Sequence, residues 1–166
     1  MLEGIINSLA QLFAPWQAVF SDSKLVDIGV TAVHLLAVLV GGGLAVSADR
    51  ATLRALRGDP LERSRVVEDL AETHRPVLIA LAVLFLSGLA LATADIKTFA
   101  HSPVFLVKMS LVTLLLINGT FLVRTEQSLR HNPTESCWRR LRTVSWISLT
   151  LWMGIVVAGV TLVNDA

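Results

Sequence analysis

Four long apolar stretches constrain this chain more than any other feature of its sequence. They cover approximately residues 26–46, 76–94, 104–123 and 144–163. About 20 helical residues cross the hydrocarbon of a bilayer, because each residue advances a helix by about 1.5 Å. Backbone polar groups in lipid must bond within their own segment, so we expect all four stretches to be helical. The predicted fold class is all-α: an integral membrane four-helix bundle forming one domain, residues 1–166.

The composition supports this interpretation. Hydrophobic residues make up 54% of the chain and charged residues only 16%, whereas a soluble domain carries roughly 25% charged residues. A single Cys excludes a disulfide-stapled scaffold. No basic stripe interleaved with aromatic residues marks a nucleic-acid surface, so we expect no nucleic-acid partner. The expected partner is the lipid bilayer.

Arginine is distributed unevenly between the predicted connecting segments. Segments 49–75 and 124–142 hold eleven of the fourteen basic residues: Arg50, Arg54, Arg57, Arg63, Arg65, Arg75, Arg124, Arg130, Arg139, Arg140 and Arg142. Loops rich in Lys and Arg stay in the cytoplasm. We therefore expect 49–75 and 124–142 to be cytoplasmic loops and both termini to lie outside the cytoplasm.

The first twenty residues have the pattern of an interfacial amphipathic helix. Apolar residues recur at helical spacing and end before Pro15-Trp16: Ile5, Ile6, Leu9, Leu12 and Phe13. Glu3 stands where a cleavable signal peptide has a basic residue. We expect this helix to lie on the outer membrane surface, with Trp16 at the level of the lipid headgroups.

Two short motifs predict where helices begin. Asp59-Pro60 combines an N-cap residue with Pro at the first helical position. It predicts a short cytoplasmic helix over 61–73 that leads into the second span. Ser102-Pro103 has the same form and predicts the start of the third span.

His34 is the first candidate for chemistry, because an ionisable residue in lipid is costly and is often functional. It lies roughly 12 Å into the first span. One helix face carries residues that recur every seven positions: Asp27, His34, Gly41 and Ala48. Small residues on this face allow a helix or a flat cofactor to approach closely. Two hypotheses stay open, a packing histidine bonded to a hydroxyl and a ligand of a metal or haem.

Lys108 and Asn118 are two polar residues of the third span that call for an explanation. Lys108 is shallow enough for its amine to extend to the outer surface. Alternatively it is a paired charge inside the protein, facing Asp27, Asp95 or an acidic group such as a haem propionate. Asn118 is expected to form a hydrogen bond between helices.

The other histidines are weaker candidates. His74 lies near the inner boundary, too far from His34 to share one iron atom, and is expected to be an interfacial helix-capping residue. His101 is placed in the outer loop and His131 in the second cytoplasmic loop. We expect both to be solvated, although His101 could approach the outer end of a His34 site.

Other metal chemistry finds little support in the sequence. Zinc would need clustered His or Cys, and copper handling would favour clustered Met or Cys. The chain has three Met and one Cys, Cys137, which is expected to be a free thiol. In the fourth span, Trp146 suits the inner aromatic belt and Trp152 is deep enough to pack inside.

Three motifs occur in an order that resembles a group of small bacterial membrane proteins. The first is Val33-His34-Leu35-Leu36, followed by Gly41-Gly42-Gly43 and Asp49-Arg50. The second is His74-Arg75-Pro76, leading to Leu86-Ser87-Gly88-Leu89. The third runs from Ser102 to Met109 and is followed by Asn118-Gly119. The group includes the membrane domain of copper-resistance protein CopD and, more distantly, the HemJ-type protoporphyrinogen oxidases.

This resemblance covers roughly residues 26–123 and implies a four-helix bundle in a bacterial inner (plasma) membrane. In some members a histidine of the first helix binds b-type haem. Carried across, that histidine is His34 and the lysine of the third helix is Lys108, while Arg50 matches the first-loop arginine. The chain lacks Tyr and has a longer first loop than the HemJ pattern. It is also much shorter than CopD.

Three functions follow as hypotheses. The first is a cytochrome b-like haem protein, with His34 as axial ligand to haem b and Lys108 beside a propionate. It would act in electron transfer or a related redox step, with a quinone or a redox protein as partner. The second is a CopD-like carrier of a metal or small solute, with Asp27, His34 and Lys108 along a polar path. The third is a non-catalytic membrane scaffold whose partners bind the arginine-rich loops.

Overall fold

The computed structural model describes residues 2–165, and their side chains except at positions 2, 71, 74 and 163–165. Residues 2–165 form seven helices and no strand. The helices are α1 (Leu2–Leu12), α2 (Ala14–Asp22), α3 (Lys24–Ala55), α4 (Pro60–Ala94), α5 (Ile96–His101), α6 (Pro103–His131) and α7 (Glu135–Asp165). The prediction of an all-α protein is confirmed.

Four of these helices are long and apolar enough to cross a membrane. The qualifying segments are Lys24–Ala55, Arg75–Ala94, Pro103–His131 and Glu135–Leu162. They contain the four predicted spans, apart from the last residue of the fourth. The chain is therefore an all-helical protein with four candidate membrane-spanning helices.

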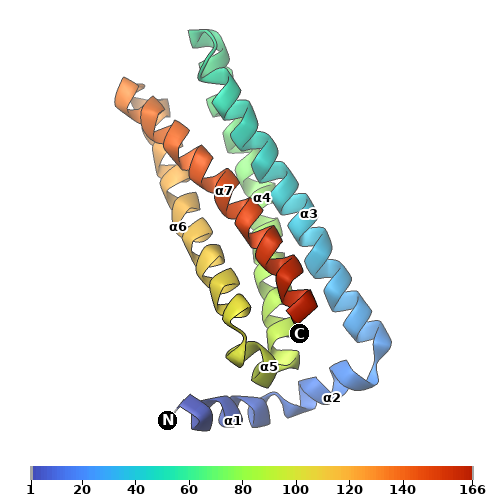
Figure 1. Cartoon of the computed structure of the whole chain (residues 1–166). Coiled ribbons are helices and arrows are strands. Elements are labelled where there is room, and N and C mark those ends of the chain that lie inside the picture. The colour runs from blue at the N-terminus through green and yellow to red at the C-terminus, as the bar shows by residue number, and fades with distance from the viewer. Residues whose placement is uncertain (1, 166) are drawn as a thin grey trace.

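The long helices are arranged as two pairs (Figure 1). α3 packs along α4 and α6 packs along α7, while α3 also contacts α7 and joins the pairs. The contact between α4 and α6 is much smaller. We call the end with the short connections 56–59 and 132–134 the arginine end, and the opposite end, where α5 lies, the α5 end. α1 and α2 lie across the α5 end (Figure 1).

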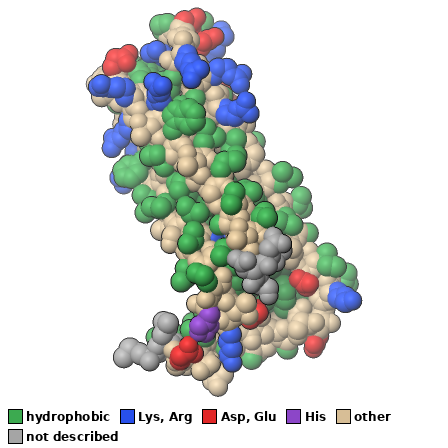
Figure 2. All heavy atoms as spheres, viewed as in Figure 1, with side chains coloured by type: hydrophobic (Ala, Val, Ile, Leu, Met, Phe, Trp, Pro, Cys, Tyr) green, Lys and Arg blue, Asp and Glu red, His purple; other side chains and the backbone are tan. Residues whose placement is uncertain are grey.

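Charged and apolar side chains separate along the length of the molecule. The basic side chains that gather at the arginine end are arginines, and the middle of the visible face shows mainly hydrophobic side chains (Figure 2). Many large apolar residues of the long helices are exposed, among them Leu39, Leu86 and Val157. Exposed apolar side chains over such a length are typical of contact with lipid.

Buried apolar residues form two clusters between the long helices. One lies toward the arginine end and contains Val66, Val67, Leu70, Leu129 and Leu141. The other contains Leu115, Trp152 and Ile155. Trp152 is 3% exposed, which confirms that it packs inside.

The glycine run in α3 brings neighbouring helices close. A Cβ at Gly41 would lie 2.9 Å from the Cβ of Ala80 in α4. A Cβ at Gly42 would lie 3.2 Å from the Trp152 ring in α7. The close helix packing expected at small residues is present within the chain.

The two predicted helix starts are confirmed by their hydrogen bonds. The Asp59 side chain accepts a bond from the Glu62 N–H at 2.8 Å, and Ser102 accepts one from the Phe105 N–H at 3.2 Å. Each satisfies a backbone donor in the first turn of its helix.

The structure differs from the expected loops at 49–75 and 124–142. Most of both segments is helical, since α3 and α6 extend past the apolar stretches and α4 and α7 begin before them. The predicted short helix over 61–73 is part of α4, which continues through Pro76. Pro76 has no N–H, so the Glu72 carbonyl is the one backbone acceptor that loses its helical donor. Glu72 is exposed, so water can donate to that carbonyl instead.

The apolar run expected to form an N-terminal helix lies in α1, apart from Phe13, and a second helix, α2, follows it. Pro15 lies in the first turn of α2. Backbone N–H groups of a first turn have no partner within the helix, so the missing N–H of proline costs no helical hydrogen bond there. The indole Nε1 of Trp16 donates to the Ala90 carbonyl at 2.9 Å, and Gln17 Nε2 donates to the Thr93 carbonyl at 3.2 Å. These bonds hold α2 against the end of α4.

Candidate functional site

His34 lies in α3 and forms a hydrogen bond with α4. Its Nδ1 atom is 3.0 Å from Ser87 Oγ. Ser87 Oγ is itself 2.7 Å from the Val83 carbonyl oxygen and 3.2 Å from that of Leu84. A hydroxyl has one hydrogen, and carbonyl oxygens only accept, so Ser87 donates to the backbone and accepts from His34. His34 Nδ1 therefore carries a proton.

This hydrogen bond determines what the rest of the ring can do. In neutral histidine one nitrogen donates and the other has a free lone pair. With the proton on Nδ1, the lone pair of His34 is on Nε2. A metal-binding histidine typically has this arrangement, with one nitrogen bonded to a nearby acceptor and the other facing the metal.

Gly88 makes room for the His34 ring. A Cβ at position 88 would lie 3.1 Å from Cε1 of His34 and 3.6 Å from its Nδ1. The pair Ser87-Gly88 thus receives the ring, with the serine fixing its orientation and the glycine allowing it to approach α4. The half-buried ring is held from one side by α4.

Lys108 extends from α6 toward α7 near the same end of the molecule. Its Nζ would lie 3.7 Å from a Cβ at Gly159, and the residue is half-buried. Among the described residues no carboxylate lies within ion-pair distance of Lys108. The ammonium is close enough to His34 to interact with it electrostatically. The structure therefore places the two residues predicted for the site within electrostatic range of each other.

The remaining predicted residues are not joined to this pair. His101 is exposed and bonds to the Lys97 carbonyl and to Glu3. His131 is exposed and bonds to the Gln127 carbonyl. Asp27 and Arg50 are also exposed, and the His74 side chain lies outside the described residues. No group of three or more His, Cys, Asp or Glu among the described side chains is placed to hold a metal ion.

Asn118 is buried and its amide donates to the Val144 carbonyl in α7 at 3.0 Å. This confirms the hydrogen bond expected between helices. Cys137 is a free thiol, as predicted.

A second polar cluster, which sequence reasoning missed, lies between α3 and α7. Asp49 is 2% exposed, its carboxylate lies near the hydroxyls of Ser145 and Ser148, and among the described residues its Oδ2 and Ser145 Oγ have no hydrogen-bond partner. Thr52, one turn beyond Asp49, and Ser145 are each 0% exposed. Two i, i+3 pairs of polar residues, Asp49 with Thr52 and Ser145 with Ser148, are the sequence signal that could have revealed it.

No protein-family model, curated protein or solved structure matches this chain. The roles of His34 and Lys108 therefore rest on their own geometry. The resemblance to CopD-like proteins has the support of the motifs alone.

Proposed function

We propose that this chain is a four-helix bundle of the CopD-like group in a bacterial inner (plasma) membrane, and that it binds haem b. His34 would hold the haem iron through Nε2, and Lys108 would pair with a haem propionate. The protein acts in electron transfer or a related redox step, with a quinone or a redox protein as partner. Haem bound at this site would supply one-electron redox chemistry.

The hydrogen bond between His34 and Ser87 carries this proposal. Ser87 uses its hydrogen on the Val83 carbonyl at 2.7 Å and is left as an acceptor for His34 Nδ1–H at 3.0 Å. The packing hypothesis also expects a bond between His34 and a hydroxyl. The support for a ligand is the bare Nε2 that this bond leaves, because only a bare nitrogen can coordinate iron.

Lys108 adds electrostatic support. No carboxylate among the described side chains lies within ion-pair distance of the half-buried Lys108 ammonium. A charge in that situation is unfavourable in a low-dielectric environment. A propionate would compensate this charge. Because Lys108 and His34 interact electrostatically, one group with a metal at its centre and carboxylates at its edge suits both residues.

The orientation in the membrane follows from the charge distribution. The arginine end is the cytoplasmic end, because basic residues are retained on that side. The His34 site then opens toward the outer half of the membrane. α1 and α2 form an amphipathic segment on the outer surface, with Trp16 bonded to α4 at 2.9 Å.

The decisive experiment is an absorption spectrum of detergent-purified protein expressed with haem supplied, oxidised and then reduced with dithionite. We expect a Soret band, with α and β bands of b-type haem on reduction. His34→Gly should lose the bands and regain them with added imidazole, whereas the control His131→Gly should keep them. A haem-replete His34→Gly protein without imidazole would contradict the ligand assignment.

A featureless spectrum of the unmodified protein would overturn the haem proposal. Metal uptake that depends on His34 in that haem-free protein would then favour the carrier hypothesis. If the haem spectrum is present, reoxidation of the reduced protein by a short-chain quinone tests the partner. If the quinone does not reoxidise the reduced protein but a redox protein does, the partner is a redox protein.

Orientation is tested with a cysteine label. Cys137→Ser removes the only thiol, and Ser136→Cys then places one at the exposed start of α7. A membrane-impermeant maleimide should label this cysteine only after the cells are permeabilised. Labelling of intact cells would place the arginine end outside.

A further inference from the structure

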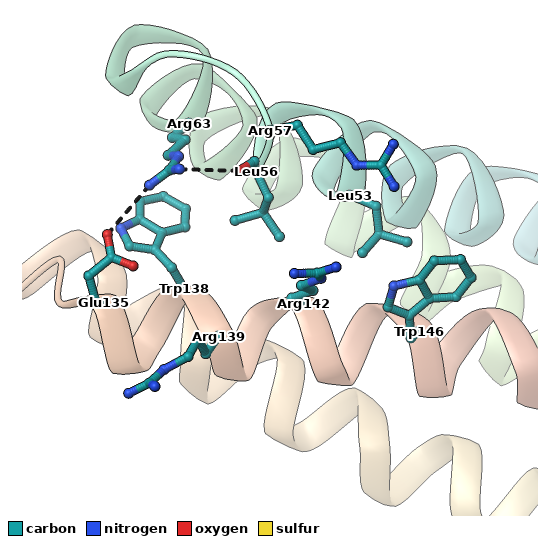
Figure 3. Close-up of a pocket in the computed structure, with 9 residues that line it drawn as sticks. All are labelled: Leu53, Leu56, Arg57, Arg63, Glu135, Trp138, Arg139, Arg142 and Trp146. Atoms are coloured by element: carbon teal, nitrogen blue, oxygen red, sulfur yellow. Dashed lines mark hydrogen bonds and ion pairs between the residues drawn. The ribbon is translucent and has the colours of Figure 1, made fainter.

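A pocket of about 210 Å³ lies at the arginine end between α3, α4 and α7. Figure 3 shows its lining residues: Leu53, Leu56, Arg57, Arg63, Glu135, Trp138, Arg139, Arg142 and Trp146. Four are arginines and one is acidic. None of them belongs to the His34 site, which lies toward the opposite end of the helices.

Arg63 is already engaged by the protein. Its guanidinium is 3.6 Å from the Glu135 carboxylate and 3.1 Å from the Leu56 carbonyl oxygen. It also lies over the Trp138 ring, 5.9 Å from the ring centroid. Arg63 and Glu135 therefore form a neutral pair that builds one wall of the pocket.

Arg57 and Arg142 leave the pocket with excess positive charge. They come from opposite sides, Arg57 from the segment after α3 and Arg142 from α7 (Figure 3). Among the described residues neither forms an ion pair with a carboxylate. Arg139 differs from them, because its side chain extends away from the other pocket residues (Figure 3).

The pocket changes from charged to apolar along the helices. On α7 the residues that line it follow helical spacing: Glu135, Trp138, Arg142 and Trp146. Trp146 and Leu53 lie at the end nearer the middle of the protein, where Trp146 is 52% exposed. An anionic group would be held by arginine at one end, and an apolar chain would contact Trp146 and Leu53 at the other.

We propose that this pocket binds the phosphate headgroup of an anionic phospholipid. The guanidinium groups of Arg57 and Arg142 present paired N–H donors that match phosphate oxygens. Trp146 occupies the depth at which tryptophan lies beside lipid headgroups. Basic pockets between membrane helices on the cytoplasmic side bind such lipids. This proposal rests on the membrane orientation proposed above but is independent of haem and of His34.

A titration of the full chain in neutral detergent tests the proposal. The melting temperature is followed against phosphatidylglycerol, phosphatidylcholine with the same acyl chains, and inorganic phosphate. We expect a saturable rise with phosphatidylglycerol alone. An equal rise with phosphatidylcholine would overturn the anionic headgroup, and an equal rise with inorganic phosphate would assign the pocket to a soluble phosphate.

Matched arginine variants locate the binding site. Arg57→Gln and Arg142→Gln should each raise the dissociation constant for phosphatidylglycerol by about fivefold or more, the effect of losing one basic contact with an anionic lipid. Arg140→Gln removes the same charge from the same helix, but Arg140 does not line the pocket and lies over the Phe121 ring of α6, so this variant should change the constant by less than about twofold. Equal losses in all three variants would indicate nonspecific charge attraction and would overturn the site.

Phosphatidylglycerol with brominated acyl chains gives a readout that does not depend on stability. Bromine quenches nearby tryptophan fluorescence, so Trp146 should be quenched in the unmodified protein. Trp146→Phe should remove most of the saturable quenching, and Arg142→Gln should move it to higher lipid concentration. Saturable quenching unchanged in Trp146→Phe would contradict the placement of the acyl chains.

Discussion

The Nε2 atom of His101 in α5 lies 3.0 Å from Oε1 of Glu3 in α1. The other ring nitrogen, Nδ1, lies 2.7 Å from the Lys97 carbonyl oxygen. Both neighbours accept hydrogen bonds, so both nitrogens can donate only in the protonated ring. The Lys97 carbonyl, and then the Glu3 carboxylate, raise the pKa of His101 above its ordinary value of about 6.5. Protonated His101 thereby fastens α1 to α5.

The attachment of α1 should depend on pH. A histidine whose pKa is raised by folding stabilises the folded state fully when the pH is below its unfolded pKa, about 6.5. This stabilisation is lost as the pH rises through the raised pKa. We expect amide hydrogen exchange in α1, corrected for its intrinsic pH dependence, to be slowest below about pH 6.5 and faster under alkaline conditions. His101→Gln should remove this dependence. His131→Gln should retain it, and an identical loss in both variants would contradict the assignment.

Ser87→Ala should weaken haem binding without removing His34. It deletes the acceptor that keeps the proton on Nδ1, and loss of such a partner costs about 10- to 100-fold in metal affinity. Haem titration of the apoprotein, followed at the Soret band, measures the change. Ser110→Ala is the control, since Ser110 is exposed and bonds only to the Leu106 carbonyl of its own helix. Unchanged affinity in Ser87→Ala would argue against tautomer control.

Gly41→Ala should destabilise the pairing of α3 with α4. The added Cβ would lie 2.9 Å from the Cβ of Ala80, so the two helices must separate. Overpacking of this kind costs about 1–3 kcal/mol of unfolding free energy. Gly43→Ala is the matched control, because a Cβ at Gly43 would meet nothing within 4 Å. That variant should be neutral or more stable by up to about 1 kcal/mol. Unfolding in mixed detergent compares the two, and equal effects would contradict the close approach at Gly41.

Asp49→Ala should destabilise the contact of α3 with α7. Asp49 is 2% exposed, and its carboxylate lies near the hydroxyls of Ser145 and Ser148 in α7. Removing a buried side chain together with its polar interactions costs about 1–3 kcal/mol. Asp27→Ala, at an exposed position of the same helix, should stay within about 0.5 kcal/mol of the original. The same unfolding measurement applies, and a neutral Asp49→Ala would show that the cluster contributes no net stability.

Much of the fold was predictable because it depends on local or periodic features. Hydropathy located the four spans, and the pairs Asp59-Pro60 and Ser102-Pro103 located two helix starts, since capping involves residues three apart. The continuity of α4 through Pro76 was not predictable in this way. The local preference of proline to end a helix was outweighed by helical hydrogen bonding on both sides.

The candidate site was only partly predictable. The free-energy cost of placing an ionisable side chain in lipid singled out His34 and Lys108. The residues that surround them depend on how α3, α4, α6 and α7 pack. Ser87 looked like an ordinary small residue of a span until α4 placed it 3.0 Å from His34. Asp49 looked like a solvated residue beside Arg50, and only the packing of α7 on α3 buries it.

The bonds that hold α2 also set an order of assembly. Trp16 and Gln17 donate to the carbonyls of Ala90 and Thr93, which leave the ribosome more than seventy residues later. α2 is therefore made early but cannot reach its final position until α4 is complete and its last turn is exposed at the α5 end. An early helix of the chain therefore takes its final place only after the last residues of α4 have been synthesised.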